Sequence, residues 1–87
     1  EDMLVKMYVG FLVPKEILIK ELEQLKKLHE EKLNLFREYE KIYFSDIKSL
    51  PLKGKYRYLN LRTGINFEIF HIKWCEEAIE FLKNEFE

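Results

Sequence analysis

The sequence has little cysteine, glycine and proline, and it has no excess of positive charge. Its single cysteine, Cys75, cannot form an intramolecular disulfide, which excludes a secreted disulfide-stabilised scaffold. Fifteen Lys and Arg against sixteen Asp and Glu give a net charge of −1, so the chain lacks the cations that nucleic-acid binding requires. The most apolar stretch, residues 3–13, is interrupted by Lys6 and Gly10 and is shorter than the roughly 20 residues that cross a bilayer. We therefore expect a cytoplasmic protein with no membrane segment.

The composition favours one small helical domain. Eighty-seven residues, 47% hydrophobic and 36% charged, support a single core. Pro14 suits the first turn of a helix, Pro51 disfavours helix at the residue before it, and Gly54 is able to turn the chain. The expected elements of this single domain, 1–87, are a linker helix in 1–13, a long helix over 14–44, a loop over 45–54 and a second long helix over 55–87.

Apolar residues recur at helical spacing in the first two of these helices. In the linker, Leu4, Met7, Tyr8 and Phe11 follow the spacing of one helical face. The long helix carries a stripe at steps of three, four and seven residues, which predicts a core or dimer seam. The residues of this seam are Leu18, Leu22, Leu25, Leu28, Leu35 and Tyr39.

The last helix is apolar on two nearly opposite sides. One side carries Leu61, Ile65, Ile69, Ile72 and Ile79, and the other is aromatic, with Tyr56, Phe67, Phe70 and Trp74. A lone antiparallel hairpin buries one of these sides, so the other requires a partner. We therefore expect an all-α fold whose hairpin pairs with a second copy into a four-helix homodimer with two-fold symmetry. The pattern leaves open which side packs within the chain.

Three segments together resemble a known family. They are FLVPKE at 11–16, LNLRTGI at 59–65 and WCEEA at 74–78. They resemble the C-terminal domain of PadR-type transcriptional regulators, also called the virulence-activator α C-terminal domain. The resemblance implies a helical, coiled-coil-like dimerisation domain that follows an N-terminal winged helix-turn-helix, a half that these 87 residues lack. It also implies that such a regulator binds DNA through that half and that its dimer forms part of a cavity for aromatic or drug-like effectors.

A candidate effector pocket lies on the aromatic side of the last helix, where a few hydrogen-bonding groups accompany the rings. Its residues are Tyr56, Asn60, Thr63, Phe67, Phe70, His71 and Trp74. The same pattern is also typical of an interface core, in which Trp74 is simply the largest buried side chain. Both interpretations remain open at this point.

The chain carries no recognisable catalytic, metal-binding or phosphate-binding motif, so we expect no enzyme and no cofactor. His29, on the seam, is expected to set helix register, as polar residues do at core positions of coiled coils. Cys75 is expected to be structural, with a thiolate disfavoured by Glu76 and Glu77. The leading hypothesis is the dimerisation and effector-sensing domain of a PadR-like regulator. The alternative is a free-standing helical adaptor or small-molecule-binding bundle unrelated to transcription.

Overall fold

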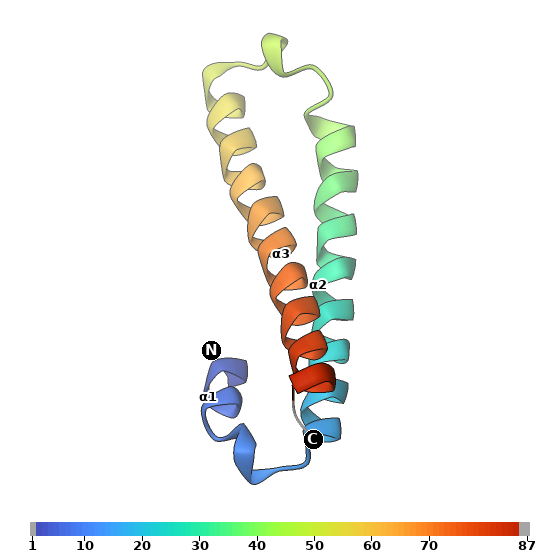
Figure 1. The fold of residues 1–87 in the computed structure, drawn as a ribbon. Coiled ribbons are helices and arrows are strands. Elements are labelled where there is room, and N and C mark those ends of the chain that lie inside the picture. Colours follow the sequence, from blue (N-terminus) through green and yellow to red (C-terminus); the bar gives the residue numbers. More distant parts are fainter. Residues whose placement is uncertain (1, 86–87) are drawn as a thin grey trace.

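The computed structural model describes residues 2–85, which form a long helical hairpin with a short helix at its base (Figure 1). Within these residues, α1 spans Asp2–Tyr8, α2 spans Lys15–Tyr43 and α3 spans Leu52–Glu85. Two short 3-10 turns, η1 (Gly10–Leu12) and η2 (Ile47–Ser49), connect them. The molecule is a rod of 55 × 18 × 16 Å. The expected all-α hairpin is confirmed.

The start of α2 follows from Pro14. This residue has φ −60° and ψ 138°, and its carbonyl accepts a hydrogen bond from the Ile17 amide at 3.1 Å. Glu16 lies in the first turn, where a carboxylate complements the helix dipole. At the other end, the Phe44 amide donates to the Glu40 carbonyl at 2.9 Å and completes the last turn. The helix bounds agree with the expected 14–44 to within one residue.

The start of α3 differs from the expectation. The helix begins at Leu52 rather than at residue 55, and Gly54 lies in its first turn with a helical backbone. Leu50 is extended, as the residue before a proline should be, and the Pro51 carbonyl accepts from the Lys55 amide at 3.0 Å. The expected loop over 45–54 is therefore too long. The chain reverses instead through η2, which requires no positive φ, so the conformational freedom of glycine is not needed there.

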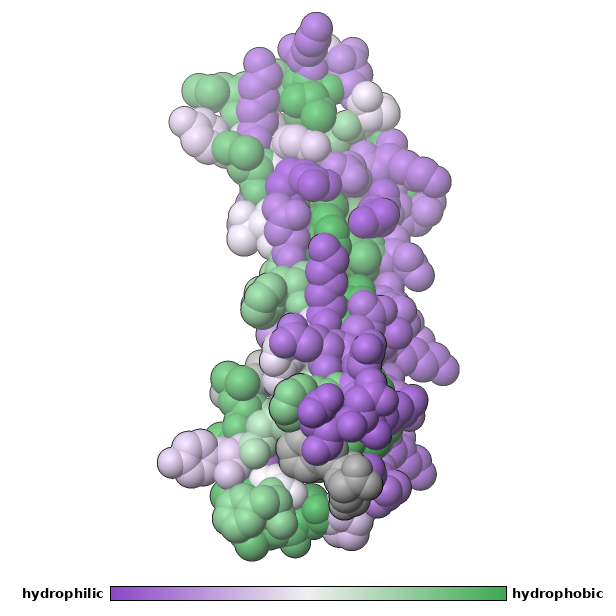
Figure 2. Space-filling model, in the orientation of Figure 1, coloured by the Kyte–Doolittle hydropathy of each residue, from purple (hydrophilic) through white to green (hydrophobic). Residues whose placement is uncertain are grey.

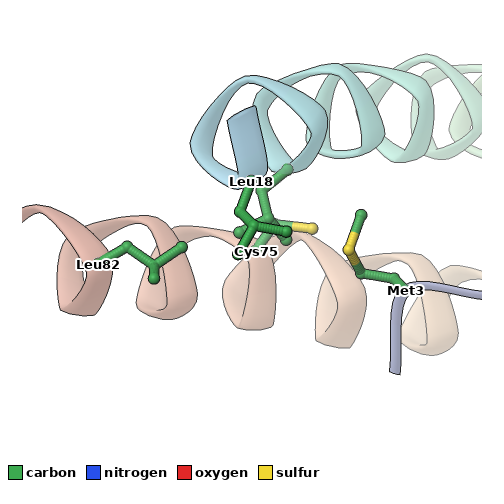
Figure 3. Close-up of a cluster of buried hydrophobic side chains, with 5 residues drawn as sticks. Met3, Leu18, Cys75 and Leu82 are labelled. Carbon is green, nitrogen blue, oxygen red and sulfur yellow. The ribbon is translucent and has the colours of Figure 1, made fainter. Parts of the chain in front are cut away.

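The core lies where the three helices meet at the base of the rod (Figure 3). Its buried side chains come from all three helices and are Met3, Leu18, Leu22, Cys75 and Leu82. Gly10 is buried beneath α2, where an added Cβ would lie 2.9 Å from Leu18 Cδ1. The absence of a side chain at this position lets the chain pass close under α2 on its way from α1.

The predicted face of α1 is wrong in part. Leu4, Tyr8 and Phe11 are exposed, and Met7 alone of that set packs partly against the core. The residue that inserts between α2 and α3 is Met3, four positions before Met7. Residues four apart share a helical face, so α1 packs against the core cluster of the hairpin through Met3 and Met7.

The predicted seam of α2 divides into two surfaces. Leu18, Leu22 and Leu25 lie in or against the core, but Leu28, Leu35 and Tyr39 are 49%, 69% and 51% exposed. Each step of three residues rotates a position by about −60°, so the steps from Leu22 to Leu25 and to Leu28 turn the stripe away from α3. The side of α2 that faces α3 continues instead through partly or fully buried residues, which are His29, Leu33, Phe36 and Glu40.

Candidate interaction surface

The structure distinguishes the two apolar sides of α3. Ile65 is fully buried on the side that faces α2. The other isoleucine-side residues are half-buried and are Leu61, Ile69, Ile72 and Ile79. The aromatic side faces outward, with Tyr56, Phe67 and Phe70 exposed by 67%, 53% and 63%. In Figure 2, hydrophobic surface gathers on the left of the rod, over α3 towards the loop and over α1 and η1 at the base, whereas the α2 side is mostly hydrophilic.

A buried polar pair lies at the centre of the α2–α3 contact. His29 Nδ1 and Glu68 Oε1 are 2.5 Å apart, and both residues are buried. The His71 ring stacks on His29 with centroids 4.9 Å apart, and the Phe67 ring lies 4.3 Å from His71. Among the described residues, every buried side-chain nitrogen and oxygen has a hydrogen-bond partner. The pair therefore lets polar atoms enter the interface without a buried unsatisfied group. The register-setting role expected of His29 stays a prediction.

Sequence reasoning missed Glu68. It follows the buried Ile65 by three residues and precedes Ile72 by four, which is the spacing of the α2-facing side. A glutamate on an apolar helical face of a chain that carries a seam histidine elsewhere is the signal that predicts such a pair. The distance in sequence between the two residues hides it, because only the antiparallel register places them together.

The candidate pocket residues share one side of α3 but do not enclose a single cavity within the described protomer. Asn60, Thr63 and Phe67 line a shallow depression beside Phe36, and the Thr63 hydroxyl donates to the Leu59 carbonyl at 3.2 Å. Phe70 and His71 form the ring cluster one turn further on. The remaining two lie apart from these, with Tyr56 near the loop and Trp74 packed against the core cluster. From Tyr56 to Trp74 the set extends about 27 Å along the helix.

The LNLRTGI segment packs α3 against the upper half of α2. Arg62 Nη1 donates to Glu40 Oε2 at 3.3 Å, and the same carboxylate accepts from the Tyr58 hydroxyl at 3.2 Å. A Cβ at Gly64 would lie 3.2 Å from Phe36 Cε2, so the glycine allows the phenylalanine ring to pack closely on the helix. These contacts hold the first half of α3 against α2.

The WCEEA segment performs the same task at the base. Cys75 is fully buried, and Glu76 Oε2 lies 3.1 Å from Lys26 Nζ on α2. The hydrogen bond to Glu76 raises the pKa of Lys26, and burial raises the pKa of the Cys75 thiol. Burial is the largest cause of the raised pKa of Cys75. The positive charge of Lys26 lowers this pKa, and the negative charge of Glu76 raises it further. Cys75 is thus a core residue whose thiolate is disfavoured chiefly because it is dry.

Two kinds of site are absent from the part of the chain that the structure describes. No three His, Cys, Asp or Glu side chains group there as ligands of a metal ion. None of the described helices is both long enough and apolar enough to cross a membrane.

Comparison with known proteins found one family. The family model described as virulence activator alpha C-term matches residues 1–83, nearly the whole chain. The searches of curated proteins and of solved structures gave no match. The match covers α1, α2 and nearly all of α3, so it includes both sides of the helix whose aromatic surface is exposed.

Proposed function

The chain belongs to the virulence activator alpha C-terminal family, and from that premise we propose that it is the dimerisation domain of a PadR-like winged-helix transcriptional regulator. The observation that carries the proposal is the exposed aromatic side of α3, opposite the side that α2 buries. A surface this apolar is rare on a monomer, whose largest exposed apolar patch is usually a few hundred Å². A second copy is the partner that removes it from water.

The thin core supports the same conclusion. Six hydrophobic residues are buried among those described, and they are Met3, Leu18, Leu22, Ile65, Cys75 and Leu82. A chain of this size is marginally stable even with a compact core, because small domains bury a smaller share of their surface. In a rod 16–18 Å thick, most side chains reach solvent. Dimerisation therefore stabilises the fold as well as joining two copies.

In this proposal the domain contributes no catalysis and no DNA contact of its own. Two-fold symmetry in the dimer would hold two winged-helix halves at the spacing of a palindromic operator. The net charge of −1 gives these residues no electrostatic attraction to phosphates, so DNA binding belongs to the winged-helix half. The regulator would act in the cytoplasm, where its operator is located.

Effector sensing is the second part of the proposal. The cluster of Phe67, Phe70 and His71 provides aromatic surface, and the amide of Asn60 provides hydrogen-bonding groups about two to three turns away. Within one protomer this surface is open, and a second copy would supply the opposite wall of a cavity for a planar aromatic compound. Such a ligand would favour one arrangement of the dimer over another through its differential affinity for the two.

The dimer is tested by sedimentation of the 87-residue chain across micromolar concentrations. We expect a two-state monomer–dimer equilibrium, with a melting temperature that rises with concentration because association stabilises the folded state. A folded monomer whose melting temperature is independent of concentration would contradict the proposal.

Effector sensing is tested with Trp74, the single tryptophan of the chain. If the aromatic surface binds planar compounds, the fluorescence of Trp74 is quenched saturably on titration, and a Phe70→Ala variant loses this response under conditions in which sedimentation shows that it is dimeric. Emission that no member of a panel of planar aromatic compounds perturbs would leave the cluster as interface core and remove the sensing part of the proposal.

A further inference from the structure

One side of the hairpin, between α2 and α3, is covered at its base by α1 and dips beside Phe36 in its loop half. Each long helix forms one edge of this side. Residues seven apart make almost two turns, so they follow one another along the same edge. These edges are Glu21, Leu28, Leu35 and Ile42 on α2, and Asn60, Phe67 and Trp74 on α3. We call this the lateral groove.

The contacts of α1 place it over the base half of the lateral groove. Lys6 Nζ lies 3.3 Å from Glu21 Oε2 on the α2 edge. On the α3 edge, Trp74 and Ala78 pack against the cluster that contains Met3. In Figure 1, α1 accordingly lies beside the lower part of the hairpin and ends well below the loop.

Two turns further along each edge, no described residue covers the lateral groove. Leu28 and Leu35 on α2 are 49% and 69% exposed, and Phe67 on α3 is 53% exposed. The α2 pair follows the line of Glu21, which pairs with Lys6 of α1. Phe67 follows the line of Trp74, which packs against the cluster that contains Met3. Between them the surface dips beside Phe36 and Asn60. We call this uncovered part, bounded by Leu28, Leu35, Phe67 and Asn60, the open half-groove.

We propose that the open half-groove is the seat of a second copy of this chain, which presents its own open half-groove in return. The two hairpins then run antiparallel and overlap only in their loop halves, and each α1 lies beyond the end of the partner hairpin. This inference rests on the proposed dimer and specifies which surface forms it.

The area of this region matches that of a dimer. Ten large hydrophobic residues on the loop half of the rod are about half to three-quarters exposed, and they are Leu28, Leu35, Tyr39, Ile42, Tyr43, Leu52, Tyr56, Leu59, Phe67 and Phe70. At roughly 100 Å² each, they amount to on the order of 1,000 Å² per protomer, against about 800 Å² per partner in a stable interface. Because this surface would also weaken the fold if left in water, its partner must be present whenever the chain is made, and a second copy meets that condition.

The position of α1 restricts how two copies can approach. A helix with its side chains is about 10 Å across, so two hairpins aligned base to base would be held roughly 20 Å apart by their two α1 helices. At that separation their loop halves could not touch without bending. An antiparallel arrangement avoids this collision, because each α1 then lies outside the overlap.

The length of the wild-type dimer tests this arrangement without any substitution. An overlap of the loop halves, about 30 Å of each 55 Å rod, gives a particle about 80 Å long, whereas full side-by-side pairing gives about 55–60 Å. Small-angle scattering of the purified dimer measures this maximum dimension. A value near 80 Å is expected, and a value below about 65 Å would overturn the half-overlap.

A matched pair of substitutions tests the surface itself. Ile17 and Leu35 are eighteen residues apart, which is five full turns, so they lie on the same side of α2, and they are 50% and 69% exposed. Leu35 borders the open half-groove, but Ile17 lies at the base. We expect Leu35→Glu to weaken the dimer at least about 100-fold, because two-fold symmetry places a carboxylate in the interface twice. Ile17→Glu should change the dissociation constant by less than about threefold.

The outcomes separate this inference from the proposed function. A monomeric wild-type chain would contradict both. A wild-type dimer that Ile17→Glu dissociates and Leu35→Glu leaves intact would retain the dimerisation function and overturn the open half-groove as its seat. If Leu35→Glu unfolds the chain while Ile17→Glu remains a folded dimer by circular dichroism and sedimentation, the result supports the inference, because Leu35 is exposed in the protomer and its loss of fold must come from loss of the partner.

Discussion

Single residues decide the register of the two long helices. The pair of His29 and Glu68 exchanges a hydrogen bond in a dry environment, with the ring of His71 stacked over it. Buried polar groups cost free energy unless they are satisfied, so a shift of α3 by one turn would leave both unpaired. The apolar residues around them tolerate such a shift better, because leucine and isoleucine can repack. The pair thus contributes specificity more than stability.

The contribution of this pair can be measured with a double-mutant cycle. Glu68→Leu alone should destabilise the protein by about 2–4 kcal/mol, because it leaves the His29 ring nitrogen buried without its partner. The His29→Leu/Glu68→Leu double variant should recover most of that loss, since hydrophobic residues of similar volume replace buried pairs at little cost. Urea unfolding gives the free energies. Costs that simply add in the double variant would show that the two residues are not coupled.

Cys75 offers a second prediction at the residue scale. Burial raises the pKa of its thiol, so the thiol in the unfolded chain ionises first, near the ordinary value of 9.0. The stability that the protonated, buried thiol contributes to the fold is fully present below the pKa of the unfolded chain. It is lost as the pH rises from that pKa toward the higher pKa of the folded state. A Cys75→Ala variant should therefore lose less stability than wild type between pH 8 and 10, as urea unfolding at each pH will show. In native wild type at pH 8, the thiol should react with Ellman's reagent far more slowly than in urea; equal rates would mean that the thiol is accessible.

At the scale of elements, proline and glycine positions explain where the helices begin and how closely they pack. Pro14 and Pro51 each precede a helix and accept its first hydrogen bonds through their carbonyls. The three glycines differ from one another: Gly10 and Gly64 lie where another side chain approaches closely, and Gly54 lies in the first turn of α3 with ordinary contacts around it. Glycine weakens a helix interior through its backbone entropy, so only close packing justifies it there.

This difference predicts opposite effects for two matched substitutions. Gly54→Ala should stabilise the protein by about 0.5–1 kcal/mol, because the new Cβ meets Leu50 at an ordinary 3.4 Å and the helix gains propensity. Gly64→Ala should give no such gain, since its Cβ at 3.2 Å from Phe36 forces the ring to move. Gly64→Val should cost about 1–3 kcal/mol through overpacking. Urea midpoints of the three variants measure this order, and an equal gain at both positions would show that the contact with Phe36 is not tight.

At the scale of the whole molecule, the rod is incomplete as a globule. Its core lies at the base, where α1 adds a third helix, whereas the loop half consists of two helices with an apolar surface outside. Stability should therefore be unequal along the rod in the monomer and become more uniform on association. The surface charge is balanced along the same rod, through pairs such as Lys6–Glu21 and Lys26–Glu76. Exposed pairs of this kind contribute about 0–1 kcal/mol each, so burial of the apolar surface dominates the energetics.

The balanced charge leads to a prediction about nucleic acid. The isolated 87-residue chain should show no sequence-selective affinity for duplex DNA, because a net charge of −1 provides no release of counterions on binding. Electrophoretic mobility shift with operator-like and scrambled duplexes at micromolar protein tests this. A salt-sensitive shift that prefers one duplex would contradict it and would place DNA recognition within the helical domain.

The sequence by itself determined the helical class, the hairpin, the bounds of α2 and the family. Hydrophobic periodicity, the proline positions and the LNLRTGI and WCEEA segments are local signals, and they act through the chain's own geometry. The same local reasoning placed Gly54 in the turn and the start of α3 at residue 55. It could not show that the chain reverses through the 3-10 turn η2, which leaves Gly54 free to join the helix.

Only the tertiary structure decided which apolar side of α3 is covered, that Leu28, Leu35 and Tyr39 leave the core, and that Met3 rather than Leu4 binds the hairpin. It also brought together His29 and Glu68, which are 39 residues apart. These outcomes depend on the register and rotation of one helix against another. That register is set by long-range packing and by buried polar partners, and residue spacing within a single helix carries no record of it.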